Sequence, residues 1–345
     1  MRIIKVLFML FCSCFFFTIN INKNETIVIN SDYNYKYSIQ EKNNSIIRKY
    51  VKGDTSQEKY KLSTNNNHLK IKSVLSSLGM DDEVIDDFSN EKLQEYDSAD
   101  MIITTSQYLK LNDEGYEVVT KEEVDTYISR VAPILPIFTD PGDGDDPNSE
   151  TLINEYLHML FTVAYLGDGT YKFSIDVLWK TQPDSRKTDF LGACAQNFTV
   201  ENSTRYGWIK YKRIVTSADE IISENQETES LSNFLNTSNS SNWTGSVVQY
   251  QLPLNYSQGN DDHFFGEFRI YYEYEGKVNY PSLPMNFNVS ATYIHTYDYL
   301  SIGDFSLSID SEGGFAGSLS ISMEEDHNKW TLEFPDSLYY NPEEE

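Results

Sequence analysis

LHMLFTVAYLGDGTYKFSIDVLWKTQP, residues 157–183, is the stretch of sequence that decides the fold. Apolar side chains occupy every second position on both sides of the central turn, Gly167-Asp168-Gly169. A period of two is typical of a strand that buries one face, and a short turn rich in glycine joins antiparallel strands. The stretch therefore predicts a long β-hairpin. Its alternating apolar residues are Leu157, Met159, Phe161, Val163 and Tyr165 before the turn and Tyr171, Phe173, Ile175, Val177 and Trp179 after it.

The period of two continues towards the C-terminus, and helical periodicity is absent there. A sandwich of two antiparallel sheets buries one face of each strand, so we predict an antiparallel, sandwich-like all-β domain over residues 151–342. The stretch 217–244 is rich in serine, asparagine and glutamate and predicts a long mobile loop. The further strand candidates are 190–200, 206–216, 246–252, 263–274, 285–297, 305–310, 315–323 and 329–334.

Residues 67–130 predict a small helical unit with a β-hairpin. Helix starts are expected at Asp81 and Ser89, and residues 101–119 contain two strand-like runs around a glycine-containing loop. A capping box at 120–123 predicts a last helix. The fold class is therefore α+β, with this unit preceding the large β domain. The first helix is indicated by Ile71, Val74, Leu75 and Leu78.

Residues 131–150 predict an acidic, proline-rich linker, because four prolines alternate there with aspartates. The alternation of Asp and Gly is compatible with bound calcium, which prefers carboxylate oxygens. The spacing of an EF-hand loop is not met, so we expect a solvated linker and assign no metal site.

The N-terminus predicts export. Arg2 and Lys5 precede an apolar run over 6–19, which is shorter than the roughly 20 residues of a membrane span. Residues 1–22 are therefore interpreted as a signal peptide, with an uncleaved anchor or a lipidated Cys14 as alternatives. A polar flexible leader is expected over 23–66, and no later segment is apolar enough to span a bilayer.

The formal net charge is −26, from 27 basic and 53 acidic residues. Such a chain repels phosphates, which argues against a nucleic-acid partner and favours a neutral or cationic one, or a metal ion. Residues 23–80 are basic, in contrast to the rest of the chain.

Removal of the signal would leave Cys194 as the only thiol, so the exported chain would have no internal disulfide. Core burial alone would then stabilise the fold, which is more typical of bacterial than of animal secretion. Cys194 could act as a nucleophile beside His158, His263 or His295, but its small neighbours are also what close sheet packing requires. Neither a G-x-S-x-G nor an H-E-x-x-H motif occurs. We assign no catalytic residue and no cofactor.

Tyrosine is abundant, with 25 residues, and it is concentrated in the C-terminal half. Exposed rings on a rigid sheet can stack on sugars or peptides at low entropic cost. The same composition also fills strands and cores, because tyrosine has a high β propensity. The candidate binding platform consists of Tyr271, Tyr272, Tyr274, Tyr293 and Tyr297.

Two pairs of segments resemble a group of uncharacterised exported proteins of low-GC Gram-positive bacteria. The first pair is VLSSLGMDDEVIDDFSNEKLQEYDSA (74–99) and TTSQYLKLNDEGYEVVTKEE (104–123). The second is the 157–183 stretch and FLGACAQNFTVENSTRYGWIKYK (190–212). The resemblance implies secretion, a bacterial source and a β-rich body, and it implies no chemistry.

Together these features predict a secreted or cell-surface protein without enzymatic activity. Its β domain would bind an extracellular glycan, peptide or protein. One alternative is a secreted hydrolase with its site on loops of the β domain. Another is a membrane-acting β protein, because alternating apolar residues over 305–323 could form an inserting hairpin.

Overall fold

The computed structural model describes most of the chain. The acidic linker expected after Val131 and residues 1–15 of the expected signal lie outside the described residues. These are 16–22, 25–30, 35–42, 45–52, 64–112, 115–131, 155–183, 186–218, 220–238, 242–296, 306–310, 318–322, 327–334 and 337–342.

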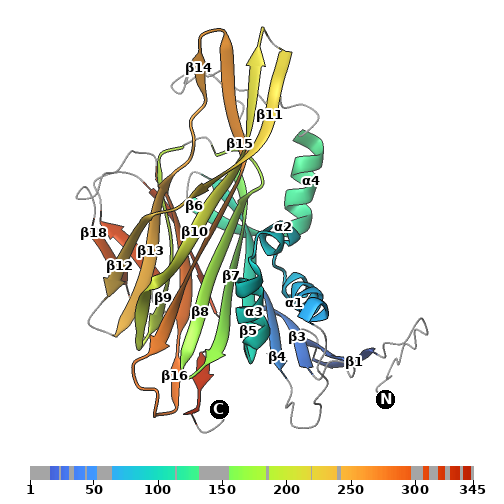
Figure 1. The fold of residues 1–345 in the computed structure, drawn as a ribbon, viewed down its shortest axis with the longest axis vertical. Helices are drawn as coiled ribbons and strands as arrows, with labels where there is room; N and C mark the ends of the chain where they lie inside the picture. Colours follow the sequence, from blue (N-terminus) through green and yellow to red (C-terminus); the bar gives the residue numbers. More distant parts are fainter. Residues whose placement is uncertain are drawn as a thin grey trace.

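A twelve-stranded antiparallel sheet, sheet A, forms the centre of the molecule (Figure 1). Ten strands follow the order β1-β2-β3-β4-β5-β7-β8-β15-β10-β11, while β6 pairs with β5 and β14 with β15. The bounds are β1 Phe16–Asn22, β2 Glu25–Asn30, β3 Tyr35–Lys42, β4 Ser45–Lys52, β5 Met101–Asn112, β6 Gly115–Val119, β7 Glu155–Gly167, β8 Thr170–Trp179, β10 Phe198–Ser217, β11 Glu220–Ser230, β14 Tyr256–Gln258 and β15 Asp261–Val278.

A second antiparallel sheet, sheet B, has five strands in the order β12-β13-β9-β17-β20. Two short strand pairs, β16–β21 and β18–β19, complete the β structure that is described. The bounds are β9 Thr188–Gln196, β12 Asn233–Ser238, β13 Trp243–Gln251, β16 Met285–Phe287, β17 Val289–Thr296, β18 Ser306–Asp310, β19 Ser318–Ser322, β20 His327–Glu333 and β21 Leu338–Tyr340.

Sheets A and B share one apolar core. The predicted hairpin forms β7 and β8, which pair from Leu157↔Trp179 to Gly167↔Thr170. All but one of its ten alternating residues are buried in this core, and the tenth, Tyr165, packs against it half-buried. Sheet B contributes Leu191 and Tyr293 from the opposite side. The prediction of a mostly antiparallel β body is confirmed.

Four helices are described, and the last three of them start at the predicted caps. The side chain of Asp81 accepts from the Glu83 backbone N–H at 3.0 Å, Ser89 from Lys92 at 3.2 Å, and Thr120 from Glu123 at 3.2 Å. These bonds satisfy backbone donors in the first turn of these three helices. The helices are α1 Thr64–Ser77, α2 Asp82–Asp86, α3 Asn90–Ser98 and α4 Lys121–Val131.

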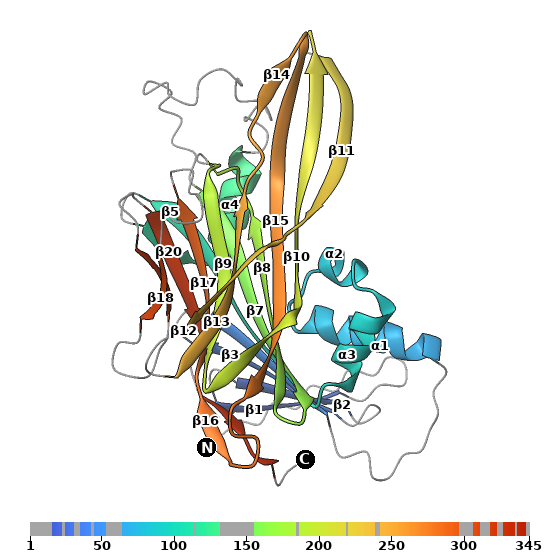
Figure 2. The ribbon, with the colours of Figure 1, turned by 60° about the vertical axis from the view of Figure 1, so that its left-hand side comes forward.

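Helices α1 to α3 cover the outer face of sheet A, the face that points away from sheet B (Figure 2). Leu75, Phe88 and Tyr96 of the helical segment belong to a second apolar cluster, which also contains Leu160 of β7 and Trp208 of β10. The central strands of sheet A are therefore covered on both faces.

The N-terminal segments do not stand apart from the β domain. Strand β5 pairs with β7 from Met101↔Tyr165 to Leu111↔Glu155, and β4 pairs with β5. Residues expected as a flexible leader over 23–66 include β2, β3 and β4, which continue sheet A. Most of β5 is buried on both faces, which explains why it lies within the sheet and not in a separate hairpin.

The prediction of a long mobile loop over 217–244 is wrong. This stretch contains strands β11 and β12. Strand β11 pairs with β10 over its whole length, from Trp208↔Ser230 to Ser217↔Glu220. Its exposed surface offers no apolar alternation, so the sequence pattern that identifies buried strands is missing there.

Strands β9 and β13 approach closely at Gly245. A Cβ atom at this position would lie 2.6 Å from the Ala193 carbonyl oxygen and 2.9 Å from Cys194 Cβ. The small residues around Cys194 therefore serve sheet packing.

We expect Gly245→Ala to lower the free energy of unfolding by about 1–3 kcal/mol, because the added methyl group has no space without a shift of β9. Urea denaturation followed by circular dichroism measures the change. Ser238→Ala, at an exposed position of the adjacent strand β12, is the control and should stay within about 0.5 kcal/mol of the wild type. Equal stability of the Gly245 variant and the wild type would contradict the close approach.

Candidate binding site

The tyrosine platform expected from the sequence lies in the interior. Tyr271, Tyr272, Tyr274 and Tyr293 are at most 2% exposed, and Tyr297 lies outside the described residues. Tyr271 belongs to the cluster beneath the helices, whereas Tyr272, Tyr274 and Tyr293 belong to the core between the sheets. The prediction of an exposed platform is wrong, because neighbouring residues of a strand point to opposite faces and both faces are covered.

The hydroxyl groups of these tyrosines have partners inside the protein. Tyr271 donates to Glu273 at 2.6 Å, Tyr272 to Ser246 at 2.6 Å, Tyr274 to the Ala193 carbonyl at 2.9 Å and Tyr293 to Asp189 at 2.6 Å. Burial raises the pKa of all four phenols. These four rings fill the core. This agrees with the alternative that the abundant tyrosines pack inside strands and cores.

Three of the exposed large apolar side chains among the described residues lie at the end of the molecule that carries β16 (Figure 1). Tyr280, Leu283 and Tyr339 are 54%, 57% and 54% exposed. We call residues 279–286 together with 337–340 the β16 tip. None of these residues carries a charge, although 23% of the whole chain is charged.

The β16 tip is tied to the body by hydrogen bonds. The Leu283 backbone N–H donates to the Tyr280 carbonyl at 3.1 Å and closes a turn. The Tyr340 hydroxyl donates to the Pro281 carbonyl at 2.7 Å, and the Asn279 N–H donates to the Asn197 carbonyl at 2.8 Å. The exposed rings are therefore presented by an ordered segment.

The core also anchors the short sheet from which the tip projects. Phe287 pairs with Leu338, and both side chains are buried in the core shared by sheets A and B. One step further out, Asn286 pairs with Tyr339, and both are exposed. An amide group that can donate and accept hydrogen bonds thus lies opposite an exposed ring.

A sequence signal for this site exists but differs from tyrosine density. The nineteen residues from Val278 to Thr296 contain no Asp, Glu, Lys or Arg, and Pro281 and Pro284 mark a turn within them. A local loss of charge in a strongly acidic chain would have indicated the β16 tip.

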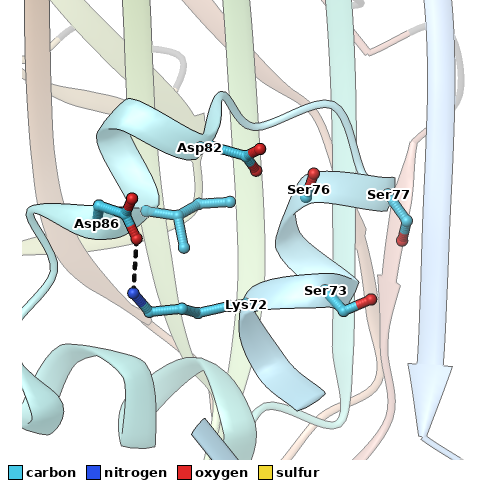
Figure 3. Close-up of a pocket in the computed structure, with 7 residues that line it drawn as sticks. Lys72, Ser73, Ser76, Ser77, Asp82 and Asp86 are labelled. Carbon is cyan, nitrogen blue, oxygen red and sulfur yellow. Dashed lines mark hydrogen bonds and ion pairs between the residues drawn. The ribbon is translucent and has the colours of Figure 1, made fainter. Parts of the chain in front are cut away.

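A polar surface depression of about 560 Å³ lies between α1 and α2 (Figure 3). The Lys72 ammonium lies 2.7 Å from Asp86 Oδ1 at its rim, so the two charges neutralise each other. Its lining offers no nucleophile beside a base. The lining residues are Lys72, Ser73, Ser76, Ser77, Asp82, Ile85 and Asp86.

A histidine and an aspartate pair in the interior. His295 Nδ1 lies 2.9 Å from Asp189 Oδ1, and Asp189 also accepts from the Tyr293 hydroxyl at 2.6 Å. An aspartate that orients a histidine is half of a hydrolase triad. Asp189 and His295 are both 0% exposed, so an external substrate does not reach them in this structure.

The histidines considered as partners of Cys194 make their contacts elsewhere. His158 stacks on Tyr108 at 4.4 Å between ring centres, His263 lies 2.9 Å from an Arg213 nitrogen, and His295 pairs with Asp189. Cys194 Sγ lies 3.1 Å from Ser290 Oγ. These contacts provide no base for the thiol.

Neither a cluster of metal ligands nor a membrane-spanning helix is found in the described part of the chain. No group of three or more His, Cys, Asp or Glu side chains is placed there to hold a metal ion. None of the helices described there is both long and apolar enough to cross a membrane.

Comparison with known proteins gives no family. No protein-family model and no curated protein matches the chain. Among solved structures, Clostridium perfringens delta-toxin has 8% identity and a TM-score of 0.21, with 71% of this chain and 92% of that chain covered. The Clostridium perfringens NetB toxin in its membrane-inserted form has 8% identity and a TM-score of 0.17, covering 54% and 94%. AvmM, which catalyses macrocyclization in alchivemycin A biosynthesis, has 12% identity and a TM-score of 0.20, covering 49% and 84%. TM-scores this low establish neither a shared fold nor a shared activity.

We expect the Cys194 thiol to be inert in the native protein. Burial raises its pKa to about 12, so at pH 8 almost none is present as the reactive thiolate, and the side chain is inaccessible. Iodoacetamide treatment followed by peptide mass mapping should find Cys194 unmodified in the native chain and modified in guanidinium. Labelling of native Cys194 at the rate of a Cys introduced by Ser238→Cys would contradict this burial.

Proposed function

We propose that the protein is an exported, non-enzymatic recognition protein that binds an uncharged glycan through the β16 tip. The observation that supports it is the exposure of Tyr280, Leu283 and Tyr339 on a segment that hydrogen bonds hold in place. The site is extracellular in this proposal, which rests on the interpretation of residues 1–22 as a signal peptide; in the structure, Phe16–Asn22 of that stretch form β1 at the edge of sheet A.

The chemistry of the tip fits a sugar. A tyrosine ring offers a broad apolar face to the C–H face of a pyranose, and it has few torsions to freeze on binding. Asn279, Ser282 and Asn286 are exposed between the apolar side chains and can bond hydroxyl groups. This mixture of ring faces and neutral hydrogen-bonding groups is what a glycan requires.

The charge of the chain restricts the choice of glycan. A net charge of −26 repels anionic polymers at low ionic strength. The tip itself provides neither a cation for an acidic sugar nor a carboxylate for a basic one. A neutral oligosaccharide is therefore the favoured ligand.

Replacement of both exposed rings, Tyr280→Ala with Tyr339→Ala, should weaken glycan binding at least tenfold, because stacked aromatic residues dominate the energy of such contacts. The measurement is isothermal titration of the full chain with neutral cello-, manno- and chito-oligosaccharides. Both side chains are about half exposed, so the variant should unfold at the temperature of the wild type.

Ile222→Ala is the matched control, since Ile222 is 55% exposed on β11, near the opposite end of the molecule (Figure 1). It should bind like the wild type. Phosphatidylcholine vesicles form a second arm. If the protein binds vesicles and none of the oligosaccharides, the ligand of the β16 tip is a neutral membrane surface and not a glycan. If the double variant binds the glycan as tightly as the wild type, the β16 tip is not the binding site.

A further inference from the structure

Sheet A ends at β11, and the outer edge of this strand pairs with no other strand among the described residues. In the strand order, β11 follows β10 and is the last strand of the sheet. Nine of its eleven residues are exposed, and neither Gly nor Pro interrupts it. In Figure 2 it forms the margin of the upper part of the sheet. A regular edge strand of this length is a template to which a further strand can be added.

The pairing of β11 with β10 determines which of its backbone groups point outwards. Residues 208–215 and 223–230 pair in one register. One residue further, the Leu231 N–H donates to the carbonyl of Gly207 directly opposite at 2.9 Å, so this pair is hydrogen-bonded. Hydrogen-bonded and non-hydrogen-bonded pairs alternate along antiparallel strands. The residues whose N–H and C=O groups point away from β10 are therefore Glu224, Gln226, Thr228 and Ser230.

The side chains along this edge are acidic. Strand β11 contains four glutamates and no Lys or Arg. Glu227 and Glu229 both accept from the single hydroxyl of Tyr211, which lies 3.2 Å from the Glu227 carboxylate. A phenol has one proton to donate, so it satisfies one carboxylate at a time. Arg213 lies 3.1 Å from Glu227, whereas no cation pairs with Glu229 among the described residues. The two carboxylates therefore keep an excess of negative charge at the edge.

A second copy of the chain does not fit this edge. Addition of β11 to another β11 would place four glutamates of each copy in one strand pair, without a cation on either strand, and like charges across a strand pair are destabilising. The net charge of −26 also opposes the association of two copies. A strand with Lys or Arg opposite Glu227 and Glu229 would reverse this balance. These positions form non-hydrogen-bonded pairs with an added strand, in which the side chains of adjacent strands are closest.

We propose that the edge of β11 binds an extended, cationic segment of a partner protein as an additional antiparallel strand, with alternate Lys or Arg side chains opposite Glu227 and Glu229. Backbone hydrogen bonds to Glu224, Gln226 and Thr228 supply affinity, and the carboxylates select a basic segment. Salt weakens the binding, because the edge is exposed to solvent.

A nine-residue peptide in which threonine and arginine alternate, beginning and ending with threonine, tests the proposal with the full chain. Fluorescence anisotropy of the labelled peptide at low ionic strength measures its binding. The same peptide with glutamate in place of arginine should bind at least tenfold more weakly, because its charges repel those of β11. The absence of binding by the arginine peptide would overturn the proposal.

Two N-methylated forms of the arginine peptide distinguish strand addition from a purely electrostatic contact. When the arginines lie opposite Glu227 and Glu229, their N–H groups point away from β11, whereas the N–H groups of the threonines point towards it. Methylation of the threonine nitrogens should therefore abolish binding, and methylation of the arginine nitrogens should change the affinity by no more than about twofold. Both forms carry the same charge, so equal binding of the two would contradict strand addition.

The double variant Glu227→Gln with Glu229→Gln tests the carboxylates. It keeps the oxygen atoms that accept from Tyr211, so the chain should fold as the wild type does. The affinity for the arginine peptide should fall about fivefold. The control, Glu41→Gln with Glu91→Gln, removes the same charge from exposed positions of β3 and α3 and should bind like the wild type. An equal loss in both variants would show that only the net charge matters, against the assignment to β11.

Sedimentation equilibrium of the full chain tests the alternative occupant. A dimer that the arginine peptide dissociates would show that β11 pairs with a second copy, and the proposal of a cationic partner would then be wrong. We expect no such dimer. Glycan binding at the β16 tip uses other residues and should be the same with and without the peptide, so the two proposals fail independently.

Discussion

The structure depends on the requirement that the central strands of sheet A be covered on both faces. Strands β7, β8 and β15 bury side chains on the side of sheet B and also on the side of the helices. The inner side is covered by another sheet and is mostly apolar, because the backbone groups of the central strands pair within their own sheets. The outer side is covered by helices, whose curved surfaces fit a flat sheet less completely, and it retains polar residues.

The polar outer side explains the distribution of charge in the interior. Lys172, Asp176, Arg269 and Glu273 are at most 4% exposed, yet each has an oppositely charged neighbour on an adjacent strand. A buried charge without a partner would be far more costly than a buried pair. Alternation along β8 and β15 places these pairs and Tyr271 on one face, and Phe173, Tyr272 and Tyr274 on the other. The same alternation that forms the core therefore also places these charged pairs beneath the helices.

The sequence predicts those parts of the fold that follow from local chemistry. The 157–183 hairpin and the caps at Asp81, Ser89 and Thr120 are confirmed, since periodicity and capping depend on neighbouring residues. Strand β11 is different, because cross-strand pairs stabilise it in place of burial. Lys212 lies 2.6 Å from Glu224, and Arg213 lies 3.1 Å from Glu227. Such partners are distant in sequence, so no local pattern reveals them.

Segments distant in sequence cover the tyrosines that were predicted to be exposed, which explains why that prediction is wrong. Tyrosine density predicts where rings occur, but exposure is decided by what packs over them. Tyr271 is hidden by the helical segment that contains Phe88, and Tyr274 by Ala193 of a strand in the other sheet. The predicted strand 190–200 likewise divides at Asn197, with φ of 60°, where the chain passes from β9 in sheet B to β10 in sheet A. At the β16 tip the strands end, and no other layer covers them among the described residues. Tyr280 and Tyr339 are therefore exposed, although tyrosine also fills the core. Exposure at the tip is thus a consequence of the layered fold, and the lack of charge there is the feature that distinguishes it from the remaining acidic surface.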